Sequence, residues 1–78
     1  MDFYIKVDND WYLSRVNSNL FWNDRDLNIN IGDKIIYQEV DWQTGEFTGR
    51  ECEKVVEYIS DTCTPPLVRF NKEYREII

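Results

Sequence analysis

Two β-rich runs separated by a glycine-containing connection constrain the fold more than any other part of the sequence. Residues 34–40 are rich in Ile, Tyr and Val, and a second run of similar character extends from Arg50 to Ile59. β-Branched and aromatic residues favour the extended backbone of strands. The connection, residues 42–49, holds two of the three glycines in the chain. The pattern therefore predicts a hairpin with a long connection.

Two short polar segments before the hairpin are typical of turns. Residues 23–26 (NDRD) form the first, because Asn and Asp side chains hydrogen-bond nearby backbone and tolerate unusual dihedral angles. Residues 31–33 (IGD) form the second, directly before the first strand of the hairpin. Gly32 has no Cβ, so we expect it to adopt a positive φ at this turn.

The rest of the chain adds short strands and one short helix. Apolar residues alternate in residues 3–7, which predicts a half-buried strand with its Phe, Ile and Val facing inward. Tyr12 and Val16 are one helical turn apart, and we expect a helix over residues 11–17. Further extended segments are expected at residues 20–22, 28–31, 67–70 and 73–78. With about six short strands and one helix, residues 1–78 are predicted to form a single α+β domain, a small open β-barrel.

Charge and cysteine usage exclude several classes of function. The chain carries 15 acidic and nine basic side chains, which gives a net charge of −6. Nonspecific nucleic-acid binding depends on Lys and Arg displacing counterions, so this balance argues against a protein that coats DNA or RNA but allows a local basic patch. Cys52 and Cys63 form no CxxC motif and the chain has no histidine, so we expect no metal, no cofactor and no disulfide.

The sequence also indicates where the protein acts. Its first ten residues, MDFYIKVDND, have acids where a secretory signal needs positive charge and an apolar run. No apolar stretch approaches the roughly 20 residues of a membrane span. We therefore expect a cytoplasmic protein with no membrane association.

A longer pattern joins the turn segments to the hairpin. It consists of NDRD, a Gly-Asp turn, a strand that ends in an acidic residue, the segment TGEFTGRE and a V-x-Y-I strand. This pattern resembles the small ASCH domains, relatives of the PUA-like fold that are common in phages and mobile elements. The resemblance is best from Asn23 to Ile59. The matching residues are Asn23, Asp24, Arg25, Asp26, Gly32, Asp33, Glu39, Thr44, Gly45, Glu46, Thr48, Gly49, Arg50, Val56, Tyr58 and Ile59.

The resemblance implies a PUA-like open barrel, borne by a phage or mobile element, that binds RNA, another single strand or a nucleotide in its opening. Arg25 would offer its planar guanidinium to a phosphate or base edge, and Trp42 would stack on a base. Trp22 and Arg50 complete the candidate ligand-binding set. The alternative for residues 23–26 is architectural, with the carboxylates capping backbone amides and holding Arg25 as an internal strut.

Enzymatic ASCH relatives use a lysine, with a neighbouring threonine and glutamate, between the helix and the NDRD segment. Here that interval is shortened to residues 17–22, and no lysine occurs between Lys6 and Lys34. The only basic residues in that stretch are Arg15 and Arg25. Without histidine, Ser–His and Cys–His pairs are excluded as well. We therefore expect no enzymatic activity and no catalytic residue, and an ASCH-type hydrolase is the least favoured of three functions.

The hairpin supports a second function of a different class. It concentrates acidic side chains with aromatic residues among them, a composition common at protein interfaces. The protein would then be an acidic inhibitor of anti-defence or anti-CRISPR type that mimics nucleic acid and docks on a basic site of a host protein. Arg50 and Lys54 are expected beside the carboxylates and partly neutralise them. The candidate interface residues are Glu39, Asp41, Trp42, Glu46, Phe47 and Glu53.

Overall fold

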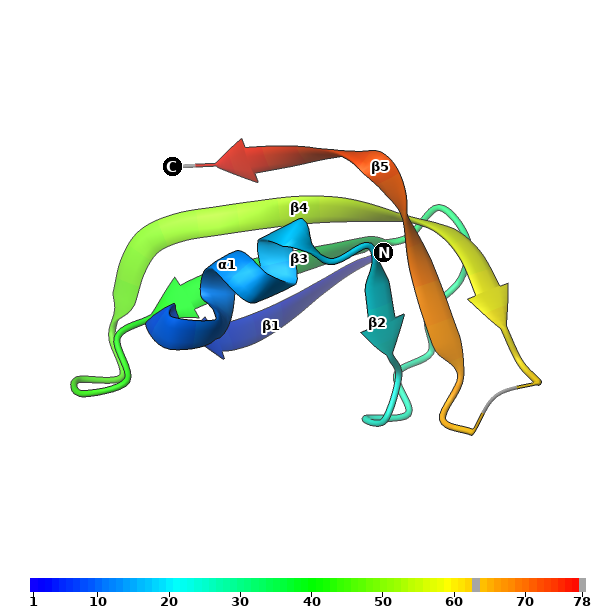
Figure 1. Cartoon of the computed structure of the whole chain (residues 1–78), viewed down its shortest axis with the longest axis horizontal. Helices are drawn as coiled ribbons and strands as arrows, with labels where there is room; N and C mark the ends of the chain where they lie inside the picture. The colour runs from blue at the N-terminus through cyan, green and yellow to red at the C-terminus, as the bar shows by residue number, and fades with distance from the viewer. Residues whose placement is uncertain (63, 78) are drawn as a thin grey trace.

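One five-stranded mixed sheet with strand order β1-β3-β4-β5-β2 forms the body of the molecule (Figure 1). The computed structural model describes residues 1–62 and 64–77, with side chains as far as residue 71. The elements are β1 (Asp2–Asp8), α1 (Asn9–Asn17), β2 (Leu20–Trp22), β3 (Lys34–Val40), β4 (Phe47–Ser60) and β5 (Leu67–Ile77). The nine-residue α1 is too short to cross a membrane, and no longer apolar helix occurs in the described part of the chain.

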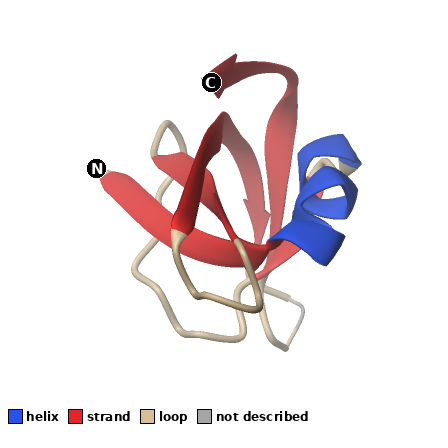
Figure 2. Ribbon diagram, turned by 90° about the vertical axis from the view of Figure 1, so that its left-hand side faces the viewer, coloured by secondary structure: helices blue, strands red, loops and turns tan. Residues whose placement is uncertain are grey.

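The first two strands of the chain lie at opposite edges of the sheet. β1 pairs in parallel with β3, and β2 pairs antiparallel with the first half of β5. Register shifts interrupt the β4–β5 ladder between Lys54 and Val56 and between Val56 and Tyr58. Such bulges bend strands and increase their twist. Figure 2 shows the result, a sheet curled into a half-barrel with α1 on one side.

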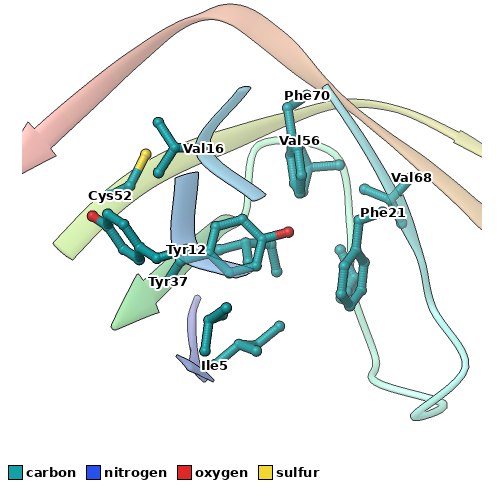
Figure 3. Close-up of a cluster of buried hydrophobic side chains, with 12 residues drawn as sticks. Ile5, Tyr12, Val16, Phe21, Tyr37, Cys52, Val56, Val68 and Phe70 are labelled. Carbon is teal, nitrogen blue, oxygen red and sulfur yellow. The ribbon is translucent and has the colours of Figure 1, made fainter. Parts of the chain in front are cut away.

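The core lies inside the curl of the sheet and is rich in aromatic rings. Tyr37 on β3 meets the ring of Phe70 edge-on at 6.4 Å, and Phe21 lies 6.3 Å from Phe70 on its other side. Figure 3 shows these rings together with side chains from β1, α1 and β4. Aromatic residues bury a large apolar area per side chain, which allows a chain this short to form a core.

The helix is held to the sheet by a buried lysine. Tyr12 and Val16 pack into the core, as their spacing predicts. Lys54 on β4 is fully buried, and its Nζ donates hydrogen bonds of 2.7 Å to the carbonyls of Val16 and Ser18. These acceptors lie at the C-terminal end of α1, where carbonyls have no partner within the helix and attract a cation. The burial lowers the pKa of Lys54. The expectation that Lys54 stands among the hairpin carboxylates is therefore wrong.

The turn before β3 joins three parts of the chain. Gly32 has a φ of +93°, which confirms the predicted positive value. Its N–H donates to the carbonyl of Val56 at 2.9 Å, and the N–H of Val56 donates to the carbonyl of Asp33 at 2.9 Å. The Asp33 carboxylate accepts hydrogen bonds from the Asn30 N–H at 2.8 Å and from the Met1 amino group at 3.1 Å. The first of these contributes most to lowering the pKa of Asp33.

The α+β class, the barrel-like curvature and the single short helix agree with the prediction, but the strand count does not. The described residues form five strands instead of about six. The predicted strands at 67–70 and 73–78 are one continuous strand, β5. Residues 28–31 stay outside the sheet because the Asp33 carboxylate holds the Asn30 N–H in a turn. The predicted absence of a disulfide concerns Cys63, which lies outside the described residues, while Cys52 is buried in the core.

Candidate functional site

A pocket of about 610 Å³ opens between the two edge strands of the half-barrel. Its lining residues come from the end of β1 with α1 on one side and from β2 with the bend that follows it on the other. The inner lining is apolar and includes Ile5, Val7 and Phe21. The rim carries charged and aromatic side chains on two flanks, a helix flank and a bend flank.

The helix flank consists of Asp8, Trp11 and Arg15. Trp11 and Arg15 are four residues apart on α1, so their side chains are neighbours on one face of the helix. Trp11 is 63% exposed although its ring is large and apolar. The helix therefore buries Tyr12 and Val16 in the core and presents an aromatic ring and a guanidinium to the pocket.

The bend flank consists of Trp22, Asp24 and Arg25. The side chain of Asn23 is buried and holds the backbone of this bend in place. Its side-chain amide donates to the carbonyl of Leu27 at 2.8 Å and accepts from the Leu27 N–H at 2.9 Å. The expected architectural role of residues 23–26 thus belongs to Asn23 and not to the carboxylates. Arg25 is exposed beside the pocket and is not an internal strut.

Tyr37 lies at the bottom of the pocket between the two flanks. It is 1% exposed, and burial raises the pKa of its hydroxyl to about 12, against the opposing effect of the Arg15 and Arg25 charges. Both guanidinium groups line the same pocket as this hydroxyl. Within the described part of the chain no group hydrogen-bonds it. A tyrosine hydroxyl that lines a pocket can donate a hydrogen bond to an acceptor placed there.

The pocket rim is more positive than the chain as a whole. Three cationic side chains, Lys6, Arg15 and Arg25, line it together with two carboxylates. The Nζ of Lys6 also lies 5.2 Å from the centre of the Phe47 ring. Among the described residues, neither arginine forms an ion pair. Two arginines beside a buried phenol can bind an anionic oxygen, and two rim tryptophans can stack on a planar ring.

Comparison with models of known protein families identifies the family of this chain. A model of a domain of unknown function, DUF3850, matches residues 15–74. The chain belongs to the DUF3850 family. No curated protein matches it. The DUF3850 match includes Arg15, the bend flank and Tyr37, so most of the pocket belongs to the shared domain.

Only two of the four ligand-binding residues predicted for this DUF3850 chain line the pocket. Trp22 and Arg25 line the pocket together, whereas Trp42 and Arg50 lie outside it. The Arg50 guanidinium lies 5.0 Å from the centre of the Tyr12 ring, and one of its nitrogens is 3.7 Å from the Glu39 carboxylate. Arg50 therefore contributes to the packing of α1 on the sheet.

The residues predicted to form a protein interface also lie in two different places. Glu39 is buried and accepts a hydrogen bond from the Thr48 hydroxyl, and Glu53 forms an ion pair of 2.7 Å with Lys34. Both are engaged within the sheet. The others lie at the tip of the β3–β4 hairpin: the Asp41 carboxylate accepts the Gln43 N–H at 2.8 Å, and Glu46, Trp42 and Phe47 are exposed. The tip keeps an aromatic and acidic surface, smaller than expected.

Most residues that line the pocket were missing from the predicted set, among them Trp11, Arg15 and Tyr37. Trp11 and Arg15 carried a usable signal, since they are four residues apart on a predicted helix and Arg15 is one of two basic residues between Lys6 and Lys34. Tyr37 lies in residues 34–40, whose composition predicts a strand but does not indicate a pocket. Its place in the pocket depends on the pairing of β1 and β2 with distant strands, which the local sequence does not encode.

Proposed function

We propose that the chain is a non-catalytic binding module that holds a nucleic-acid strand or a nucleotide in the opening of the half-barrel. The observation that carries this proposal is the lining of one pocket by two tryptophans, two arginines and Tyr37, whose hydroxyl has no hydrogen-bond partner among the described residues. The resemblance of Asn23–Ile59 to ASCH domains supports the same ligand class. We assign no catalytic residue.

The pocket offers separate groups for the two parts of a nucleotide. Guanidinium groups bind phosphate oxygens with paired hydrogen bonds. With its pKa raised to about 12, the Tyr37 hydroxyl keeps its proton at neutral pH and can donate to the same phosphate. The exposed rings of Trp11 and Trp22 can stack on bases. Stacking requires bases that are free of a partner strand, so a single strand is favoured over a duplex.

The test is the affinity for single-stranded RNA and DNA octamers, measured by fluorescence anisotropy. Arg25→Ala and Trp22→Ala should each weaken binding about tenfold, since one stacked base is worth roughly 1–3 kcal/mol. Arg69→Ala and Tyr58→Ala are matched controls, because both side chains are exposed outside the pocket. Few phosphates are contacted, so the salt slope should correspond to about two or three. An Arg25→Ala/Trp22→Ala double variant that binds like the parent would refute the site.

The hairpin tip favours a second candidate, an inhibitor that docks on a basic site of a host protein. Trp42 and Phe47 are 59% and 55% exposed there, beside Glu46. Exposed rings give affinity and surrounding charge gives association rate. With a partner recovered from nuclease-treated lysate, Glu46→Lys should slow association and Trp42→Ala should speed dissociation, while Tyr58→Ala serves as control. Unchanged kinetics in both hairpin variants would remove this candidate.

A further inference from the structure

We propose that the pocket is built for two consecutive nucleotides of a single strand, with the phosphate that joins them at Tyr37 and one base on each flank. This inference rests on the proposed function and adds the size and polarity of its ligand. It starts from the two flanks, because each presents the same three chemical groups: a tryptophan ring, an arginine and an aspartate.

The two flanks come from different elements. On the helix flank, Trp11 and Arg15 are adjacent on α1, which follows β1 directly. On the bend flank, Trp22 ends β2 and Arg25 follows within the bend that Asn23 fixes. Since β1 and β2 are the opposite edges of the sheet, the flanks face each other across the opening. A ligand that uses both must therefore span it.

Tyr37 marks the centre of this arrangement. Its side chain is 1% exposed, no described residue hydrogen-bonds its hydroxyl, and Arg15 and Arg25 line the same pocket. One arginine from each flank thus lines the pocket that holds Tyr37. A phosphodiester there would accept hydrogen bonds from the phenol and from guanidinium groups on two sides. Its two attached nucleosides would then extend in opposite directions, one towards Trp11 and the other towards Trp22.

The aspartates give a reason why each flank holds a base and not only a phosphate. Asp8 and Asp24 would repel a phosphate, but a carboxylate accepts hydrogen bonds from the amino group of cytosine. A ring to stack on, a carboxylate for the base edge and an arginine for the phosphate form a complete set for one nucleotide. The set occurs twice around a pocket of about 610 Å³, which lies within the range of roughly 300–1,000 Å³ for organic ligands.

Calorimetric titration of the full chain with cytidine oligonucleotides of increasing length tests the footprint. The probes are cytidine monophosphate, the dinucleotide CpC, and the trimer, tetramer and hexamer. We expect affinity to rise about tenfold or more from the monophosphate to CpC, through the second stacked base, and to change little from the tetramer to the hexamer. Trp11→Ala and Trp22→Ala should each reduce the affinity for CpC to about that of the monophosphate.

Tyr37→Phe separates a ligand contact from a structural role. Phenylalanine keeps the ring that packs on Phe70, and the removed hydroxyl has no partner among the described residues. The variant should therefore keep the stability of the parent while its affinity for CpC falls about fivefold or more. Equal CpC affinity in Tyr37→Phe and the parent would overturn the placement of the phosphate. Tyr58→Ala is the aromatic control.

The outcomes distinguish this inference from the function on which it rests. If the monophosphate binds as tightly as CpC, one base lies between both tryptophans, and the two-nucleotide footprint is overturned while nucleotide binding stands. A steady rise in affinity through the hexamer overturns the footprint as well. If none of the probes binds, or if an acidic peptide alone occupies the pocket, the proposed function itself falls.

Discussion

Replacing Lys54 with methionine should destabilise the protein through the helix rather than through the sheet. Methionine keeps most of the apolar side chain but removes the two hydrogen bonds to the carbonyls of Val16 and Ser18. A hydrogen bond from a charged donor is worth roughly 1.5–3 kcal/mol. Because the variant also avoids burying a charge, we expect a net loss of about 2–4 kcal/mol. A chain of this length has a total stability of roughly 4–12 kcal/mol, so the loss is large.

Urea unfolding followed by circular dichroism at equilibrium measures this loss as a shift of the midpoint. Lys34→Met is the matched control, because Lys34 is half-exposed in its ion pair with Glu53 and such pairs contribute about 0–1 kcal/mol. The Lys54 variant should also bind nucleotides more weakly, since an isolated nine-residue helix is marginal and α1 carries Trp11. A midpoint equal to that of Lys34→Met would refute the role of Lys54 as the link between helix and sheet.

Three further predictions concern the turn and the cysteines. Gly32→Ala should cost about 1 kcal/mol or more, because its φ of +93° is strained for any residue with a Cβ, and thermal melting would show this. The pKa of Asp33 is lower in the folded protein than its usual value of 3.8, so the ionised carboxylate stabilises the fold. This contribution is complete at pH values above 3.8 and is lost as the pH falls through the lowered pKa of the folded protein. The melting temperature of Asp33→Asn should therefore depend less on pH below about 4 than that of the parent. Thiol titration of the denatured, non-reduced protein should find both Cys52 and Cys63 reactive, and elemental analysis should find no stoichiometric metal.

Local features of the sequence were sufficient for much of the fold. The hairpin follows from strand propensity, the φ of Gly32 from its place at a turn, and the buried face of α1 from the spacing of Tyr12 and Val16. Each of these depends on residues that are close in the chain. Of the four residues predicted to bind a ligand, Trp22 and Arg25 line the pocket, whereas Trp42 and Arg50 lie outside it.

The features that the sequence did not predict, the burial of Lys54 and the pocket, depend on contacts between distant segments that no local pattern encodes. Lys54 lies on a strand next to glutamates, which favours an exposed ion pair, yet the carbonyls at the end of α1 bury it. Whether α1 docks on β4 is decided by tertiary packing. Likewise, the pocket exists because β1 and β2 join opposite edges of one sheet, and the three residues of β2 do not identify their partner strand.

This edge placement also sets an order of events during biosynthesis. Both sides of the pocket are made first, but Asp2 pairs with Lys34 and Leu20 pairs with Arg69. While the chain emerges from the ribosome, β2 therefore has no partner until residues 67–69 have been translated. Pairings between distant segments also form slowly. Chains that have not yet paired β2 with β5 would consequently lack the pocket and, under the proposed function, would not bind a nucleotide.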